Sequence, residues 1–404
     1  MTKHQIIIVG GGAAGIATAS SLLSRDASLD IAIIEPSDQH FYQPGWTMVG
    51  AGIFTKGQTV RSTDSAWPSG IKRIKGAVAT FSPDKNNIIL EDGSEVLYEY
   101  LVVAAGLKLD WGAIEGLENT LGKNGVTSNY RFDLAPYTWE LVQKMQGKTA
   151  IFTQPPMPIK CAGAPQKAMY LSCDAWLKAG KLSGIEVSFC NAGPVLFGCA
   201  PYVPPLMEYV KKYDISLDFG HNLVKIDGPN RKAWFKMTKD GEDSQVVERK
   251  FDMIHVCPPQ CAPDFIKDSS LSGAGGWVDV DQATLQHTAY ENVFGLGDVT
   301  STPNAKTVAA ARKQAPIVAQ NLIAKIRGQS LAPLYDGYGS CPLTVEKGKI
   351  ILAEFGYGGK VMPTFPWDST KPRRAAWFLK KSILPWVYWN VMLKGREWLT
   401  KTTA

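Results

Sequence analysis

The segment QIIIVGGGAAGIATASSLL, residues 5–23, decides the fold of this 404-residue chain. Its apolar start predicts a buried strand over 5–9, and the glycines from Gly10 to Gly15 predict a tight turn. The small apolar residues over 16–23 predict a helix that packs closely against that strand. A second strand is predicted over 31–34, so the order strand, turn, helix, strand is that of a nucleotide-binding βαβ unit.

Each residue type in the turn has a physical task. Gly10 permits the tight turn, Gly12 lets the backbone approach a pyrophosphate at the positive helix end, and Gly15 lets helix and strand pack closely. Glu35 follows at the tip of the second strand, where its carboxylate can accept hydrogen bonds from ribose hydroxyls. We therefore predict that a dinucleotide binds at Gly10, Gly12, Ala14, Gly15 and Glu35. The alternative is a Rossmann-type turn that binds no ligand.

Two later segments indicate which dinucleotide binds. A strand over 101–104 ends in Ala105-Gly106, and NVFGLGD, residues 292–298, places Asp298 after a strand and a glycine pair. A helix is expected from about Lys306. In FAD enzymes of the glutathione-reductase type, a similar Gly-Asp pair holds the ribityl chain, and the following helix directs its positive end at the flavin. The predicted cofactor is therefore FAD, and the alternative for Asp298 is a helix N-cap.

A second βαβ unit begins with a predicted strand over 148–153, followed by a helix over 164–179 and a strand over 185–191. The loop between its first strand and its helix reads QPPMPIKCAG, residues 154–163. Three prolines remove backbone donors there, and no Gly-x-Gly lets the chain approach a pyrophosphate. This unit is therefore predicted not to bind NAD(P)H, so the electrons must come from another donor.

Together these features predict an α/β fold with two Rossmann-like domains of the glutathione-reductase type. We expect residues 1–110 and 270–330 to form the FAD-binding domain, and residues 111–269 to form the second domain, without a competent NAD site. Residues 331–404 are expected to form a C-terminal region with amphipathic helices at a membrane surface.

The positive charge is concentrated in the C-terminal tail. The chain has a net charge of +6, whereas residues 371–404 hold eight Lys or Arg and one acid. The rest of the chain is close to neutral and gives no footprint for nucleic acid. Four of the twelve tryptophans also lie in this tail. Basic and aromatic residues together suit the headgroup region of an anionic bilayer, while core packing or a homo-oligomer interface is the alternative.

The same pattern argues against a membrane span. The longest apolar stretch, 382–393, is shorter than the roughly 18 residues that cross a bilayer, and Pro385 is expected to divide it into two short helices. The N-terminus runs directly into the first strand, which predicts no signal peptide. The expected location is therefore peripheral, or monotopic, on the cell inner membrane, and a bacterial cytoplasmic membrane is favoured.

The chain contains seven cysteines, an odd and widely scattered set that argues against a secreted disulfide scaffold. We expect Cys173, Cys190 and Cys199 to be buried as small hydrophobic residues. The segment CPPQC, residues 257–261, has no partner Cys or His pair at ligand spacing, so no metal site is predicted. For Cys161 and Cys341 a buried structural thiol is the alternative to a redox role.

Two long segments around these last cysteines resemble one family. PIKCAGAPQK, residues 158–167, and YDGYGSCPL, residues 335–343, resemble sulfide:quinone oxidoreductases, within the subgroup that includes the mitochondrial-type enzyme. The likeness covers nearly the whole chain. Further similar segments lie at 42–47, 276–281, 284–287, 295–298, 306–307, 351–355 and 388–390.

The resemblance implies roles for individual residues. Cys161 and Cys341 would form the redox disulfide, with Cys341 carrying the sulfane sulfur and Cys161 facing the flavin, while Lys167 and Lys380 would lie near the active site or the quinone. FAD contacts would extend to Gln43, Val78 and Lys306 beside Asp298 and the glycine turn, and Phe355 and Tyr388 are assigned to the quinone. The family also has an acidic residue where this sequence has Asn119.

The implied function is sulfide:quinone oxidoreductase. Hydrogen sulfide would be oxidised through a persulfide on Cys341 and through FAD, a membrane quinone would be reduced, and the sulfane sulfur would pass to sulfite, glutathione or sulfide. The alternatives are a type II NADH:quinone dehydrogenase, a flavocytochrome c sulfide dehydrogenase and a catalytically inactive flavin-fold adaptor.

Overall fold

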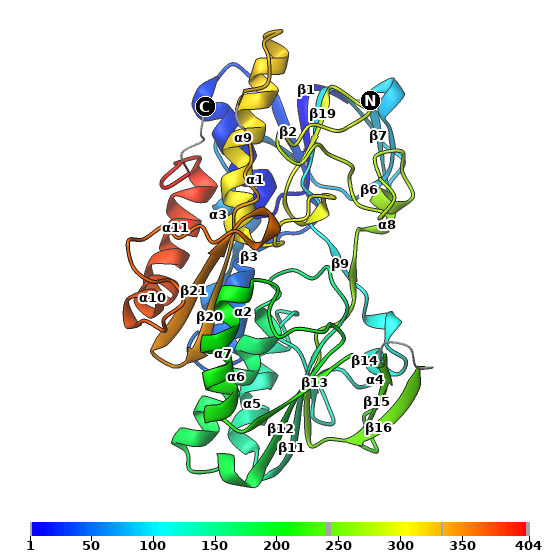
Figure 1. Ribbon diagram of the computed structural model, residues 1–404. Coiled ribbons are helices and arrows are strands. Elements are labelled where there is room, and N and C mark those ends of the chain that lie inside the picture. Colours follow the sequence, from blue (N-terminus) through cyan, green and yellow to red (C-terminus); the bar gives the residue numbers. More distant parts are fainter. Residues whose placement is uncertain (1, 239–243, 333, 401–404) are drawn as a thin grey trace.

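The computed structural model describes residues 2–238, 244–332 and 334–400. A first sheet forms the upper lobe in Figure 1. Its strand order is β5 (Lys72–Ile74), β2 (Ile31–Ile34), β1 (Thr2–Val9), β8 (Glu95–Val103), β7 (Asn87–Leu90) and β6 (Val78–Ser82), with β19 (Val293–Gly295) also paired to β8. All pairs except β6–β7 and β7–β8 are parallel. Helices α1 (Ala13–Arg25) and α9 (Val308–Ile326) pack together in this lobe.

A second sheet forms the lower lobe in Figure 1. Its strands are all parallel, in the order β10 (Val126–Thr127), β17 (Met253–His255), β11 (Lys148–Gln154), β12 (Ile185–Asn191) and β13 (Ile215–Phe219). The accompanying elements are helices α5 (Ala135–Lys144), α6 (Ala164–Lys178) and α7 (Val203–Lys212), and an antiparallel sheet of β14 (His221–Asp227), β15 (Lys232–Met237) and β16 (Gln245–Lys250). The α/β fold with two Rossmann-like sheets is therefore confirmed.

Short elements connect these parts. They are β3 (Gln39–Phe41), α2 (Trp46–Val49), β4 (Val60–Ser62), α3 (Thr63–Ala66), β9 (Lys108–Leu109), α4 (Leu117–Thr120), β18 (Gln260–Cys261) and α8 (Asp264–Lys267). Two antiparallel pairs, β3 with β4 and β9 with β18, bring segments that are distant in the sequence into contact.

The first turn has the geometry that its glycines predict. Gly10 has a left-handed φ of +103°, and a Cβ added there would lie 2.6 Å from the carbonyl oxygen of Ala104. A Cβ at Gly15 would lie 1.9 Å from the carbonyl oxygen of Gly10. Any larger residue at either position would therefore separate α1 from the sheet.

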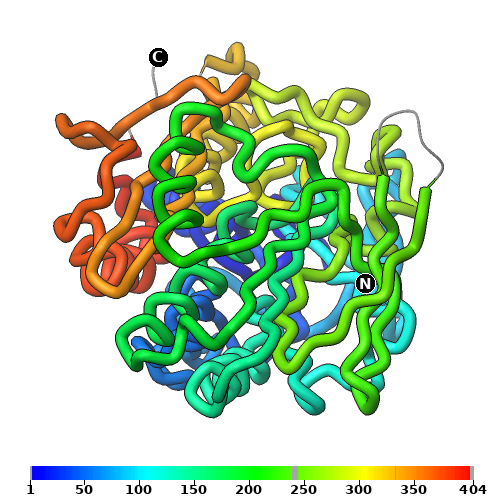
Figure 2. Tube along the Cα trace, turned by 60° about the horizontal axis from the view of Figure 1, so that its bottom comes forward, coloured from blue at the N-terminus to red at the C-terminus, as the bar shows by residue number. Residues whose placement is uncertain are grey.

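The C-terminal region lies along one side of both lobes (Figure 1), and Figure 2 shows the same orange and red segment gathered at one side of the molecule. It contains the hairpin β20 (Gly339–Glu346) and β21 (Lys349–Phe355), then α10 (Arg374–Phe378), a π-helical turn (Leu379–Ile383) and α11 (Leu384–Asn390). None of the helices in the described part of the chain has both the length and the apolar composition needed to cross a bilayer.

The expectation that Pro385 separates two helices was wrong. Helical structure runs without a gap from α10 through the π-helical turn into α11, and Pro385 lies in the first turn of α11. Proline is tolerated at that place because the N–H it lacks would have no partner within the helix.

Hydrogen bonds fix this tail to the first lobe. The Ser20 hydroxyl on α1 donates to the Leu393 carbonyl at 2.9 Å, and Arg25 pairs with Glu397. Nearer the turn, His40 Nδ1 donates to the Gly11 carbonyl at 3.2 Å and His40 Nε2 accepts from the Tyr388 hydroxyl at 2.6 Å. We infer this tautomer because a carbonyl can only accept.

Burial of His40 predicts a loss of stability in acid. Desolvation lowers the pKa of His40 to about 4, below the ordinary value of 6.5, so the unfolded chain binds a proton that the folded protein resists. Stability is therefore complete above pH 6.5 and is lost as the pH falls toward 4, by about 3 kcal/mol for this residue. In urea titrations across this range, His40→Asn should show a shallower fall than the wild type. An equally steep fall would show that His40 does not contribute.

Candidate active site

A cavity of about 210 Å³, open to solvent, lies between the two lobes and the C-terminal region. Its wall comes from segments far apart in the sequence. The lining residues include Gln43, Trp46, Thr47, Asn129, Tyr130, Lys160, Cys161, Lys167, Asp298, Lys306, Tyr338, Ser340, Glu354, Lys380 and Tyr388. Of the fifteen residues that the sequence assigned to flavin, catalysis or quinone, seven line this wall: Gln43, Cys161, Lys167, Asp298, Lys306, Lys380 and Tyr388.

The nucleotide turn fits the diphosphate of FAD. A Cβ at Gly12 would meet no atom within 4 Å, so the outer side of the turn is open, whereas the inner sides at Gly10 and Gly15 are filled. No side chain caps the N-terminus of α1, which leaves its amide groups free for an anion. Ala14 is buried in the first turn of this helix. The predicted residues therefore suit a pyrophosphate.

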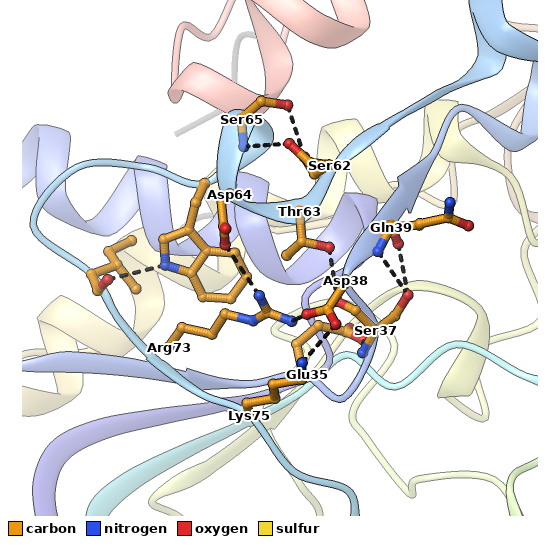
Figure 3. Close-up of polar contacts among 12 residues, drawn as sticks. Glu35, Ser37, Asp38, Gln39, Ser62, Thr63, Asp64, Ser65, Arg73 and Lys75 are labelled. Atoms are coloured by element: carbon orange, nitrogen blue, oxygen red, sulfur yellow. Dashed lines mark hydrogen bonds and ion pairs between the residues drawn. The ribbon is translucent and has the colours of Figure 1, made fainter.

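Glu35 is held in place for the ribose. Its two carboxylate oxygens accept hydrogen bonds from the backbone N–H groups of Gly11 and Ser37, both at 2.7 Å. Figure 3 shows that Arg73, on β5, pairs with Asp38 in the loop after Glu35 at 2.9 Å and with Asp64 on α3 at 3.1 Å. These charge pairs brace the chain just beyond Glu35. The carboxylate keeps lone pairs that can accept from ribose hydroxyls.

Val78 occupies a different kind of position. It is buried at the start of β6, on the antiparallel side of the first sheet. The structure therefore shows it as a core residue of that lobe, and its contact with FAD stays a prediction.

Asp298 and Lys306 line the cavity on the side where the sequence predicts the flavin. Asp298 follows Gly297, which has a φ of +79°. The Lys306 ammonium donates to the carbonyls of Asp298 and Thr300, each at 2.8 Å, and burial lowers the pKa of Lys306 to about 8. Thr307, rather than Asp298, caps α9, because its hydroxyl accepts the Ala310 N–H. This excludes Asp298 as the cap of that helix and leaves its carboxylate at the cavity wall.

Three further residues of the cavity wall have buried polar atoms without a partner. The indole nitrogen of Trp46, the hydroxyl of Thr47 and both side-chain polar atoms of Asn129 are buried and make no hydrogen bond. Buried polar groups are normally paired, so such atoms at a cavity wall indicate a ligand with polar edges. The flavin ring system has such edges. Gln43, nearby, accepts a hydrogen bond from the Lys160 ammonium at 2.7 Å.

Cys161 has a strained and tightly held backbone. Its φ is +51°, a left-handed conformation that costs a residue with a side chain about 1 kcal/mol or more. The Cys161 N–H donates to the Lys306 carbonyl at 2.8 Å, and its own carbonyl accepts from the Ala164 N–H at 2.7 Å. The first bond links the second lobe to the flavin side of the cavity.

The two predicted redox cysteines are brought together. Cys341 lies on β20, which packs against α6, and its thiol hydrogen-bonds to that of Cys161. This bond lowers the pKa of Cys161 despite its burial, and the Lys167 ammonium, 3.1 Å from Cys161 Sγ, lowers it further. The same bond, together with burial, raises the pKa of Cys341. Cys161 is therefore the thiolate of the pair and Cys341 the neutral donor.

Cys341 points to the face of the β20–β21 hairpin that is turned away from the cavity. Cys341 is fully buried among apolar residues beside α6, whereas its neighbours Ser340 and Pro342 line the cavity. Alternation along a strand explains this arrangement. The thiolate of Cys161 lies at the cavity wall, and Cys341 lies behind it.

Of the remaining predicted residues, Lys380 and Tyr388 line the cavity and Phe355 does not. Lys380 is buried, donates to the Pro44 carbonyl at 2.9 Å, and has a pKa lowered to about 7 by burial and by the charge of Lys167. Tyr388 lines the cavity, with its hydroxyl turned to His40. Phe355 ends β21, packs edge-to-face on Phe197 at 5.7 Å, and is not part of the cavity wall.

Two residues that the sequence did not predict hold the loop that carries Cys161. Gln260 Oε1 accepts the Lys160 N–H at 2.7 Å, and the Tyr130 hydroxyl donates to the Lys160 carbonyl at 3.2 Å. Gln260 lies within CPPQC, residues 257–261, a segment whose sequence raised only the question of a metal site. Cys257 of that segment is buried and its pKa is raised to about 12. No spacing of residues in the sequence pointed to Tyr130. As expected, Cys173, Cys190 and Cys199 are buried.

This fold and site define the class: a FAD-dependent disulfide oxidoreductase. The family model described as pyridine nucleotide-disulphide oxidoreductase matches residues 4–143. The mitochondrial sulfide:quinone oxidoreductase of Dictyostelium discoideum is 44% identical, over 99% of this chain and 88% of that protein, and that of Mus musculus is 40% identical, over 97% and 87%. The chain belongs to the sulfide:quinone oxidoreductase family.

A solved structure agrees at the level of the fold. The sulfide:quinone oxidoreductase from the hyperthermophilic bacterium Aquifex aeolicus superposes with a TM-score of 0.77 at 20% identity, over 96% of this chain and 92% of that chain.

Loss of the Lys167 charge should raise the pKa of Cys161. We expect Lys167→Met to shift the pH at which the reduced protein forms the Cys161 thiolate upward by about one to three units. The pH dependence of Cys161 alkylation, followed by mass spectrometry, measures this shift. Lys178→Met is the matched control, because Lys178 lies on the same helix and pairs with Asp174 at 2.6 Å instead. Equal alkylation profiles in the wild type and Lys167→Met would refute the assignment.

Proposed function

We propose that this protein oxidises hydrogen sulfide at the Cys161–Cys341 pair and reduces a membrane quinone, with FAD between them. The observation that supports it most directly is the unequal pair of thiols: Cys161 is acidified by Cys341 and Lys167 at the wall of the cavity, and Cys341 is not. When bound, FAD supplies a two-electron acceptor for the thiol pair and passes both electrons to the quinone.

The pKa difference sets the direction of sulfide attack. Thiolate attack on a disulfide is faster when the departing sulfur has the lower pKa. In the Cys161–Cys341 disulfide, hydrosulfide therefore attacks the sulfur of Cys341, the S–S bond breaks, and Cys161 leaves as a thiolate. Cys341 then holds a persulfide. Lys167 stabilises the charge that develops on Cys161.

The acceptor of the sulfane sulfur must be small or must wait for the hairpin to open. Cys341 is 0% exposed and lies behind the cavity wall. Of the acceptors expected from the sequence, sulfide and sulfite fit this burial better than glutathione. Transfer of the outer sulfur leaves Cys341 as a thiol, and the two thiols then lose two electrons and reform the disulfide.

NADH is disfavoured as the electron donor by the position of β20. In a competent second Rossmann unit the pyrophosphate would lie at the N-terminus of α6. Here the Cys161 carbonyl accepts the Ala164 N–H at 2.7 Å, and a Cβ on Gly163 would lie 2.3 Å from a methyl carbon of Leu343. The loop and the hairpin therefore occupy the space that a pyrophosphate would need.

The C-terminal helices give the quinone its route. Phe378, Trp386 and Trp398 are 60%, 56% and 52% exposed, and Lys381 and Arg374 beside them are exposed as well. Exposed aromatic and basic residues on short helices suit the interface of an anionic bilayer, and the same segment lines the cavity through Lys380 and Tyr388. A lipid-dissolved quinone would enter there.

The proposed location is a quinone-containing inner membrane. The two relatives described above are named as mitochondrial proteins, so a quinone-containing inner membrane is supported, and a bacterial cytoplasmic membrane is not favoured over a mitochondrial one.

Replacing either redox cysteine should stop turnover with sulfide. We expect Cys161→Ser and Cys341→Ser each to reduce sulfide-dependent quinone reduction by at least about 1000-fold, because each sulfur is one end of the relay. FAD content and the absence of bleaching by NADH should be unchanged. Absorbance of the flavin under anaerobic sulfide measures the first half of the reaction. Cys173→Ser, a buried thiol of α6, is the control, and near-normal turnover in either redox variant would refute the relay.

Removal of exposed aromatic rings should weaken membrane binding. We expect Phe378→Ser with Trp386→Ser to lower binding to anionic vesicles in sedimentation assays at least about 10-fold, because each ring contributes apolar burial that salt does not screen. Leu177→Ser with Met207→Ser, 43% and 41% exposed on the second lobe, is the matched control. Equal binding of both double variants would show that the tail is not the docking surface.

A further inference from the structure

The cavity has a second polar end, remote in sequence from the cysteines, that the reaction described above does not use. Glu354 on β21 is 3% exposed and lies at the cavity wall. It pairs across the hairpin with Ser340, which lines the same cavity, while Ala353 pairs with Cys341 on the opposite face. One hairpin therefore presents the sulfur-bearing thiol on one face and a buried carboxylate on the other.

Three donors surround this carboxylate. The Tyr338 hydroxyl and the Thr364 hydroxyl each donate to Glu354 Oε1 at 2.5 Å, and the Thr364 N–H donates to Oε2 at 3.1 Å. Tyr338 and Thr364 line the cavity as well. The carboxylate is thus buried and hydrogen-bonded, and Oε2 keeps lone-pair capacity.

Cations from α9 face the same group. Arg312 lines the cavity and hydrogen-bonds to Tyr338, and Lys313 lies 5.3 Å from the centre of the Tyr338 ring. Asp336, on the segment before β20, interacts with Lys313. Arg312, Tyr338 and Glu354 thus form one network at the cavity wall, and α9 connects it to the Asp298–Lys306 side.

A second opening joins this network to solvent. A second hollow opens to solvent and is lined by residues that include Lys313, Tyr338, Thr364 and Trp398. Tyr338 and Thr364 border both hollows. Tyr338, hydrogen-bonded to Glu354, therefore borders both the main cavity and the second hollow. Through that hollow, water could return a proton to the pair.

The chemistry of the second half-reaction needs such a pair. Reduction of a quinone to a quinol consumes two electrons, which the proposed route through FAD supplies, and two protons, which must come from the protein or from water. A general acid held at the cavity wall protonates the developing quinol oxygen faster than bulk water does, so a positioned donor at this wall would speed the step. We propose that Glu354, together with Tyr338, delivers a proton to the quinone oxygen and is reprotonated from solvent through the second opening. This inference rests on the proposed function.

A purely structural role is the competing explanation. Glu354 also fixes the loop at Thr364, and its backbone accepts the Met362 N–H at 2.9 Å. A structural clamp would affect every electron acceptor equally. A proton donor would affect only an acceptor that takes up protons, so two acceptors separate the explanations.

The experiment compares a soluble ubiquinone analogue with ferricyanide, a one-electron acceptor that takes up no proton, using the FAD-loaded full-length protein. With sulfide as donor, Glu354→Gln should lower the rate with the quinone at least about 10-fold and the rate with ferricyanide less than about twofold. Glu346→Gln, on the same hairpin and paired with Lys212 and Lys349, is the matched control and should leave both rates unchanged. Anaerobic bleaching of the flavin by sulfide is measured in parallel.

Tyr338→Phe keeps the carboxylate and both Thr364 bonds, so it decides the question if Glu354→Gln does not fold. It should lower the quinone rate relative to the ferricyanide rate in the same direction. Equal loss with both acceptors, or no loss with either, would overturn the proposal. Absence of sulfide bleaching in the wild type would overturn the proposed function and this inference with it, whereas bleaching with an unchanged ratio of the two rates overturns this inference alone.

Discussion

The site depends on one backbone hydrogen bond, from the Cys161 N–H to the Lys306 carbonyl at 2.8 Å. It joins the loop of the second lobe to the segment that leads into α9, and it holds Cys161 in a left-handed conformation that the residue would not adopt alone. Gln260 and Tyr130 support it by binding both backbone groups of Lys160. The thiol position is therefore set by the meeting of the two lobes.

The surrounding groups give the two cysteines different pKa values. Cys341 and Lys167 both stabilise a thiolate on Cys161. Lys167 and the Gly163 backbone also act to lower the pKa of Cys341, but its bond to Cys161 and its burial outweigh them and raise that pKa. A second ammonium, on Lys380, lies close enough to be affected by Lys167 and has a pKa lowered to about 7. Two buried lysines near one thiolate therefore need not both be charged at neutral pH. The cost of burying charge is thereby limited while Cys161 remains ionised.

The C-terminal region closes the cavity and exposes aromatic rings from the same short helices. His40 links the Gly11 carbonyl of the nucleotide turn to the Tyr388 hydroxyl of α11, and Ser20 and Arg25 on α1 bind the chain beyond it. The inner faces of these helices are thus part of the core, and their outer faces are free for a lipid surface. Deletion of the tail would open the first lobe, which is why surface substitutions test the membrane proposal more cleanly.

The sequence by itself determined the fold class and the nucleotide turn, and its resemblance to a family pointed to Cys161 and Cys341 as the predicted redox pair, because strand and glycine patterns and long local segments are properties of neighbouring residues. It also placed Glu35 and Asp298 at the ends of strands. Only the tertiary structure decided that Cys341 donates to Cys161, that Gln260 holds the loop, and that Phe355 lies outside the cavity while Glu354 lies within it. These depend on which lobes and strand faces meet across long sequence separations, and alternation along β21 reverses the environment of adjacent residues without changing the local sequence signal.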